Sequence, residues 1–110
     1  MVKIMLLLAR RAGTSPDDFA QHLQVTHVPL VMQLPGLRRL VLNHIQPIPD
    51  APPPAWDAIA EDWFDSPDAL QAALASPQGQ AVNTDAATFL DLSKLHFLVL
   101  DEHEITLPTA

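Results

Sequence analysis

The chain contains no cysteine, only three glycines and only six lysine or arginine residues among 110. Without cysteine there is no disulfide framework, no thiolate zinc site and no cysteine nucleophile, which also suits a reducing cytoplasm, the location we predict. The scattered glycines form no phosphate-binding loop. A net charge of −7 argues against nucleic-acid binding, because phosphates are neutralised by clustered basic residues.

No long hydrophobic run is present either. The apolar stretch near the N-terminus is too short to cross a bilayer and has no small-residue cleavage site, so we expect a buried strand there and no membrane partner. With 48% apolar content, the chain fits one domain over residues 1–110 with a modest core.

The charges are divided unevenly along the chain. Residues 1–49 hold five basic and two acidic residues, for +3, and residues 50–110 hold one basic and eleven acidic residues, for −10. This division indicates attraction within the chain, antiparallel contact between two copies, or simply a soluble acidic surface.

Three Ser-Pro pairs stand directly before helical patterns, at Ser15-Pro16, Ser66-Pro67 and Ser76-Pro77. A serine N-cap accepts a hydrogen bond from an unpaired amide of the first turn, and the proline that follows already has a helical φ. The pairs predict where helical segments begin. Within the first segment Pro29 lacks an amide hydrogen and clashes with the preceding turn, so we expect the helix to kink or end near His27 and Val28.

Four segments have the apolar content or the period-two alternation of strands: residues 3–9, 37–46, 56–64 and 95–100. Five prolines in residues 47–54 indicate an extended loop, the best candidate for a mobile rim. The order predicts an α+β fold of the ferredoxin-like βαββαβ type, with a four-stranded antiparallel sheet and helices on one face. Apolar residues on the other face require a cover, so we expect a homodimer that forms a dimeric α+β barrel.

His27 is the first catalytic candidate, because the expected break at Pro29 leaves carbonyl groups free around it. A helix C-terminus favours the imidazolium ion whereas burial favours the neutral ring, so the sequence leaves its charge state open. The residue is either a general base or substrate ligand, or a structural cap of the kinked helix.

The other histidines give weaker signals. His22 precedes His27 by five residues, so on a regular helix it should point well away and be solvent-exposed. His44 and Asn43 are neighbours on a strand, so at most one of them enters a given pocket. Because no histidine has ligand spacing to another or to a carboxylate, we predict no metal site.

Glu61 and Trp63 share one face of the third strand with Ile59. A carboxylate beside apolar surface can have a raised pKa and act as an acid or base. The alternative is that Glu61 forms an ion pair with Arg38 or Arg39, across strands or across the dimer. Trp63 is either a core or interface anchor or a pocket wall.

Two segments of the chain resemble the EthD family. The first contains residues 10–15, Phe19, and the runs His27-Val28-Pro29-Leu30-Val31 and Leu34-Pro35-Gly36, and the second spans residues 57–74 with the run AIAEDWFDSPDAL. The His-x-Pro-Leu-Val segment with the Leu-Pro-Gly downstream is the specific part of this resemblance.

The resemblance implies a ferredoxin-like fold that pairs into a dimeric α+β barrel, and it matches His27 to the helix histidine of the family. Related barrels include cofactor-free monooxygenases, a lactone isomerase, and cyclases, dehydratases or decarboxylases of aromatic polyketides. The family name comes from an association with ether degradation. The chain departs from the family at Leu40 and Leu42, where members have a tyrosine and a polar residue, which implies a more apolar pocket.

We therefore expect a small cytoplasmic homodimer that binds an apolar or aromatic metabolite between sheet and helices without metal or organic cofactor. In the catalytic hypothesis His27 transfers a proton with help from Glu61 or His44, and the substrate-binding residues are His22, Leu40, Leu42 and Trp63. In the alternative hypothesis the dimer binds a ligand or serves as an accessory protein without catalysis. A third hypothesis is haem- or flavin-linked oxidation, which some related barrels suggest.

Overall fold

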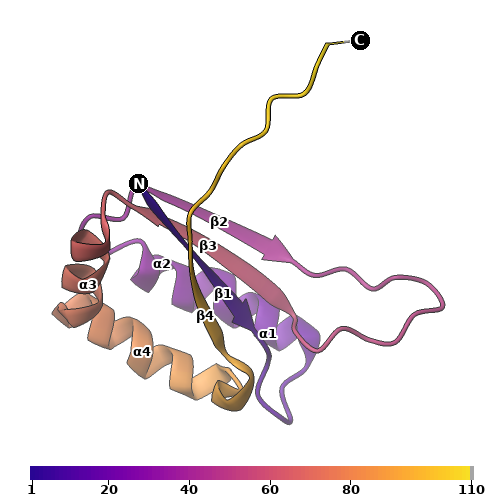
Figure 1. Cartoon of the computed structure of the whole chain (residues 1–110). Helices are drawn as coiled ribbons and strands as arrows, with labels where there is room; N and C mark the ends of the chain where they lie inside the picture. The colour runs from indigo at the N-terminus through magenta and orange to yellow at the C-terminus, as the bar shows by residue number, and fades with distance from the viewer. Residues whose placement is uncertain (110) are drawn as a thin grey trace.

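A computed structural model describes residues 1–109 of the chain. Four strands are present: β1 (Val2–Leu8), β2 (Arg39–His44), β3 (Ala58–Phe64) and β4 (His96–Leu100) (Figure 1). The helical elements are α1 (Pro16–His22), the π-helical turn η1 (Leu23–His27), α2 (Val28–Val31), α3 (Pro67–Ala75), α4 (Pro77–Phe89) and the 3-10 turn η2 (Leu92–Lys94). The predicted element order is confirmed, with strand boundaries displaced by only one or two residues.

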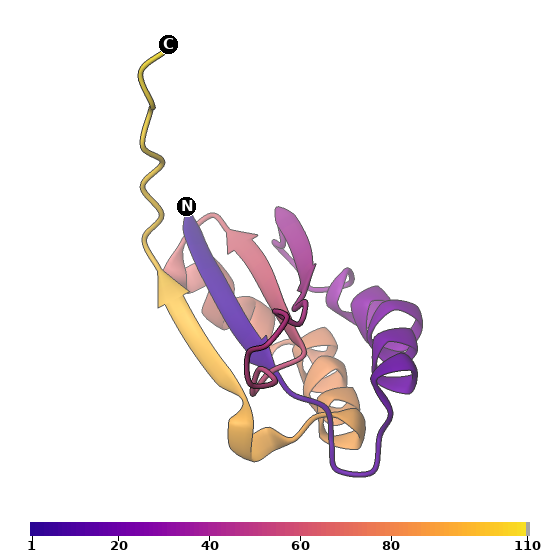
Figure 2. The ribbon, with the colours of Figure 1, turned by 90° about the vertical axis from the view of Figure 1, so that its right-hand side faces the viewer.

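The strands form one antiparallel sheet in the order β2-β3-β1-β4. Both central strands pair in a regular register, with Ile4 opposite Asp62 in β1·β3 and Leu40 opposite Asp62 in β2·β3. All helices lie on one face of this sheet (Figure 2). The predicted ferredoxin-like arrangement is therefore the one that the chain adopts.

The three Ser-Pro pairs start helices as predicted. The hydroxyl oxygens of Ser15, Ser66 and Ser76 each accept a hydrogen bond 3.1 Å long, from the amides of Asp18, Ala69 and Gly79 respectively. Proline occupies the first turn in each case. Because these signals are local, they can be read from the sequence without knowledge of the fold.

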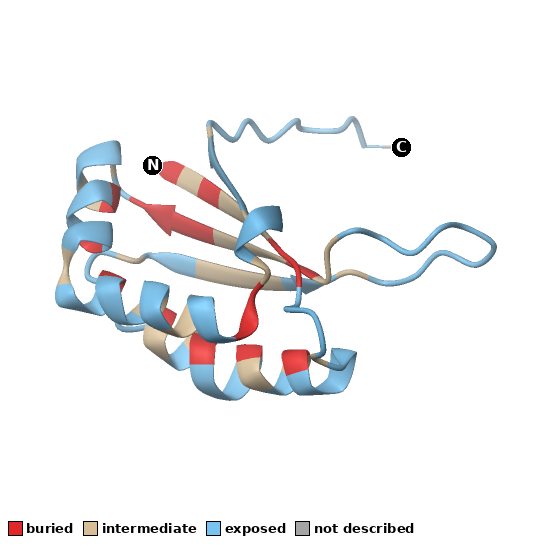
Figure 3. Ribbon diagram, turned by 90° about the horizontal axis from the view of Figure 1, so that it is seen from below, coloured by how far each residue is buried: buried red, intermediate tan, exposed pale blue. Residues whose placement is uncertain are grey.

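The residues coloured as buried in Figure 3 lie on the strands and on the helices that cover them. One cluster consists of Val2, Ile4, Val31, Leu34, Phe64, Leu70 and Ala73. A second cluster consists of Leu8, Phe19, Leu23, Ala58, Phe89 and Leu90, with Leu42 and Ala60 packed against it. We call the sheet face that carries these residues the covered face.

The opposite sheet face, which we call the open face, carries Met5, Leu7 and Leu98 together with a charged group. Lys3 Nζ lies 2.6 Å from Glu61 Oε2 and 3.0 Å from Glu102 Oε2. Arg38 and Asp65 form a second pair, at 2.7 Å. These pairs join the basic first half of the chain to its acidic second half, so the uneven charges attract each other within one chain.

Two segments extend from the sheet. The proline-rich segment between β2 and β3 protrudes beyond the sheet, and residues 101–109 lead away from β4 in an extended form (Figure 1). Mobility of the proline-rich rim stays a prediction. In the described part of the chain, no helix combines the length and apolar character needed to cross a membrane.

Candidate functional site

The candidate site begins with the π-helical turn η1. Pro29 has no amide hydrogen to offer the carbonyl four residues before it, and its ring crowds that carbonyl. The helical turn contains one extra residue instead, because the amide of Val28 donates to the carbonyl of Leu23, five residues back. The predicted disturbance near His27 is present, but the helix continues into α2. Single π turns of this kind are frequent at functional sites.

The π turn brings His22 and His27 to the same carboxylate, that of Asp85 on α4. His27 Nδ1 lies 2.8 Å from Asp85 Oδ2, and His22 Nε2 lies 3.0 Å from both carboxylate oxygens. The side chains are 30% exposed for His22, 13% for Asp85 and 9% for His27. The three groups, which we call the His-Asp-His cluster, thus run from the surface into the interior.

Phe89, one helical turn beyond Asp85 on α4, fixes both imidazole rings. The His22 ring stacks on it with a centroid distance of 4.3 Å, and the His27 ring is tilted against it at 5.0 Å. Because Phe89 is itself in the buried core, the rings have little freedom to turn away from the carboxylate. The cluster is therefore held in place in the absence of a ligand.

Burial lowers the pKa of His27, and this effect outweighs the opposing influence of the Asp85 carboxylate. The ring is consequently neutral at neutral pH. With Nδ1–H donating to Asp85, the neutral tautomer carries its lone pair on Nε2. Within residues 1–109, this nitrogen has no hydrogen-bond partner.

The expected position of His22 was wrong. On a regular α-helix, residues five apart point in different directions, and this was the basis for placing His22 alone in solvent. In a π turn the hydrogen bonds span five residues, so His22 and His27 share a face. His22 is partly buried and belongs to the site.

Glu61 and Trp63 lie on the open face, so the sheet itself separates them from His27. Hydrogen bonds from Lys3 and then Asn43 lower the pKa of Glu61, so of the two alternatives the ion pair is present and the raised pKa is not. Its partner is Lys3, not one of the arginines. Trp63 is 6% exposed and lies under the Arg39 guanidinium, 4.5 Å from the ring centroid. It does not line a pocket together with Leu40 and Leu42.

Leu40, Leu42 and His44 project from β2 onto the covered face. The two leucines are half-buried, and His44 is exposed at the end of the strand. His44 Nε2 lies 3.0 Å from Gln24 Nε2 of the π turn. His44 and Leu42 therefore lie where edge strand β2 meets η1, whereas Leu40 packs against the cluster that contains Val31 of α2.

Sequence reasoning missed two carboxylates on the covered side, Asp62 and Asp85. Asp62 follows Ala58 and Ala60 in the apolar alternation of β3, and it is 6% exposed. Asp85 follows Val82 by three residues and precedes Phe89 by four, which puts it on the apolar stripe of its helix. In both cases the signal was an acidic residue at a core position.

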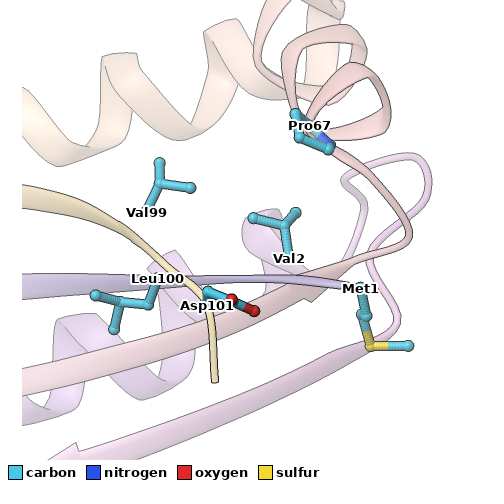
Figure 4. Close-up of a pocket in the computed structure, with 6 residues that line it drawn as sticks. All are labelled: Met1, Val2, Pro67, Val99, Leu100 and Asp101. Atoms are coloured by element: carbon cyan, nitrogen blue, oxygen red, sulfur yellow. The ribbon is translucent and has the colours of Figure 1, made fainter. Parts of the chain in front are cut away.

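A hollow of about 250 Å³ beside the cluster is lined by Asp18, Gln21, His22, Val25 and Thr26. A second, larger hollow of about 350 Å³ is lined by Met1, Val2, Pro67, Val99, Leu100 and Asp101, which Figure 4 shows. Only the first hollow borders the His-Asp-His cluster. Among the described residues, no three His, Asp or Glu side chains have an arrangement that could hold a metal ion.

Solved structures with the same fold include an EthD family protein from Bacillus halodurans, with a TM-score of 0.79, 25% identity, and coverage of 94% of this chain and 100% of that one. A dimeric ferredoxin-like protein of unknown function from Thermobifida fusca has a TM-score of 0.70, 14% identity, and coverage of 90% and 88%. SnoaB, a cofactor-independent oxygenase from Streptomyces nogalater, has a TM-score of 0.68, 18% identity, and coverage of 98% and 97%. The last two likenesses show the fold alone.

A sequence relative gives a closer match. An uncharacterised 11.0 kDa protein of Rhodococcus erythropolis, from the thcB-thcC intergenic region, is 36% identical over 74 residues, which are 67% of this chain and 71% of that protein. The EthD domain pattern matches residues 11–93, a range that contains the π turn, strands β2 and β3, and Asp85. The chain therefore belongs to the EthD domain family.

Proposed function

We propose that the protein is a cofactor-independent small-molecule enzyme in which His27 transfers a proton on an apolar or aromatic metabolite. The observation that carries this proposal is the buried His27 ring, held at Nδ1 by Asp85 with Nε2 unpaired. Isomerisation, dehydration, decarboxylation and cyclisation all depend on such a group. The same fold in the cofactor-independent oxygenase SnoaB is compatible with chemistry of this kind.

Asp85 has two roles in the proposed reaction. It fixes the tautomer, so that Nε2 faces the substrate as a base, and it stabilises the imidazolium that forms when the proton arrives. Because burial lowers the pKa of His27, the ring starts neutral and ready to accept a proton at neutral pH. A general base at an active site is expected to have a pKa that its surroundings shift in this way.

His22 connects the same carboxylate to solvent. Its Nε2 shares Asp85 with His27, and its side chain borders the hollow of about 250 Å³. His22 therefore donates to the same carboxylate and helps to hold Asp85 in the position that His27 requires. In this role His22 is a positioning residue, in place of the substrate contact predicted from the sequence.

The substrate is proposed to lie in the helix-sheet layer against Leu40 and Leu42, with His44 as an auxiliary group at the edge of β2. Glu61 has no part in this chemistry, since it faces the other way.

We further propose that the open face pairs with a second copy of the chain. Met5, Leu7 and Leu98 give it apolar surface, and a neighbour of the same fold is dimeric. Location in the cytoplasm, a role in ether degradation and the absence of a nucleic-acid partner stay predictions.

The test compares His27→Gln with His103→Gln, a matched variant of an exposed histidine that lies beyond β4 and outside the cluster. Each protein is incubated with a panel of aromatic polyketides and lactones, and products are measured by mass spectrometry. We expect His27→Gln to lose turnover by about 100-fold or more, with dimer and melting temperature nearly unchanged. Equal turnover in both variants would contradict the proposal.

A non-catalytic ligand-binding role is the second candidate. The apolar side chains of Leu40 and Leu42 favour it, because they offer a reacting group no hydrogen-bond donor. In this case members of the panel raise the melting temperature of the wild type without forming product. The same incubations therefore separate the two functions.

A further inference from the structure

Asp62 is a buried carboxyl group that the proposed proton transfer does not use. It projects from β3 onto the covered face, between Ile4 of β1 and Leu40 of β2. The residue is 6% exposed, and its Oδ1 atom is fully occluded without a hydrogen-bond partner within residues 1–109. Almost all buried polar atoms of folded proteins have partners, so this one requires an explanation.

No cation within the described residues lies near Asp62 to compensate its charge. Burial alone raises its pKa to about 6, with no contribution from a charged neighbour. The nearest strand partners are aliphatic, and the basic residues Lys3 and Arg39 face the opposite side of the sheet, where they contact Glu61 and Trp63. An aliphatic residue at this position would avoid the cost of desolvating a carboxyl group.

A second copy of the chain cannot supply the missing donor if the dimer forms through the open face. Asp62 points the other way, under the helices. The donor must then come from a water molecule or from a ligand in the helix-sheet layer. Asp62 lies one strand in from the edge, beside the half-buried Leu40 and Leu42.

We infer that Asp62 accepts a hydrogen bond from a hydroxyl group of the ligand, and that the site therefore takes a hydroxyaromatic compound, a phenol or an enol. The aliphatic walls suit the ring, and Ala60, opposite Leu42 in the register, is a small side chain beside them. A neutral hydroxyl is favoured over an ammonium group as the donor. The layer has no second carboxylate at this point to stabilise a cation, and removing a cation from water costs more free energy than removing a hydroxyl group. The inference deepens the proposed function by naming its substrate class, and it rests on the same layer being the binding site.

The test uses two probes that differ only in the hydroxyl group, 1-naphthol and 1-methoxynaphthalene. Isothermal titration measures both with the wild type, Asp62→Leu, Asp62→Asn and His27→Gln, at one pH and one protein concentration. For the wild type we expect 1-naphthol to bind about 10-fold more tightly than the ether, the usual effect of one hydrogen bond to a charged acceptor. In Asp62→Leu we expect the two probes to bind within about 2-fold of each other, because the acceptor is gone.

The variants separate this inference from the proposed function. His27→Gln should keep the hydroxyl preference while losing turnover, and Asp62→Asn, which retains a carbonyl acceptor and nearly the same shape, should keep part of the preference. Circular dichroism of each variant checks that it folds. If the leucine variant does not fold, the hydroxyl preference measured with Asp62→Asn is compared with that of the wild type instead. The inference is overturned if the wild type shows no naphthol binding or no hydroxyl preference, or if the preference survives in Asp62→Leu.

Discussion

Replacing Asp62 by asparagine should change the pH dependence of stability in a way that follows from its burial. Burial raises the pKa of Asp62 from 3.8 to about 6. The folded state therefore holds this proton more tightly than the unfolded chain does. The stabilising contribution is fully present below the unfolded value of 3.8 and is lost as the pH rises through about 6.

The size of the effect follows from the same difference. At about 1.4 kcal/mol for each pKa unit the whole shift is worth about 3 kcal/mol, of which the wild type should lose about 2.5 kcal/mol of unfolding free energy between pH 4 and pH 7.5 through this one group. Asparagine has nearly the same shape and no charge to desolvate. The stability of Asp62→Asn relative to the wild type should therefore rise by about 2.5 kcal/mol over this range.

Urea denaturation at several pH values, with ionic strength and protein concentration held constant, measures this difference. Fixed concentration is needed because dissociation of a dimer contributes to the apparent stability. Asp65→Asn is the matched control, since Asp65 is exposed and the neighbouring Arg38 lowers its pKa. Its difference from the wild type should have the opposite sign and be small. A flat difference for Asp62→Asn from pH 4 to pH 7.5 would refute the claim that this carboxyl is buried without a partner.

Three further predictions concern the helix, the core and the proposed dimer. Pro29→Ala restores an amide donor, so the π turn should relax towards a regular helix and turn His22 away from Asp85; turnover should fall while helical circular dichroism is kept, and unchanged turnover would contradict this. Gly79→Ala places a Cβ atom 2.5 Å from backbone oxygens at the end of α3 and should cost about 1–3 kcal/mol in urea denaturation; wild-type stability would show that the junction yields easily. Leu98→Asp puts a charge on the open face and should shift the protein towards monomer in ultracentrifugation, whereas Val99→Asp, on the other face, should not; equal dissociation constants would remove the open face as the interface.

The elements of this fold follow from signals that are local in the sequence. Each Ser-Pro pair marks its own helix start, and each strand shows its apolar content within a few residues. The order βαββαβ then leaves few topologies, because crossovers between parallel strands are right-handed. For this reason the order of the elements is enough to predict that the helices lie on one face of the sheet.

The site was less predictable because it depends on contacts between distant segments. The partner of His27 is Asp85, 58 residues away, and no spacing rule connects them. The position of His22 was wrong for a different reason, since the regular helical repeat does not hold where Pro29 widens the turn. For Glu61 the decisive fact was strand order, which places β1 and its Lys3 beside β3.

The two faces of the sheet differ in how far their polar and charged groups have partners. On the open face the charged groups compensate one another, since Lys3 and Arg39 together balance the charges of Glu61 and Glu102. A surface of this kind can be buried against a second copy without leaving a charge unpaired, which is the usual obstacle to burying ionised groups. On the covered face the opposite holds among the described residues, because Asp62 has no partner and His27 keeps one nitrogen free. Unmet hydrogen-bonding capacity is therefore concentrated on the side where a ligand, and not a protein partner, can satisfy it.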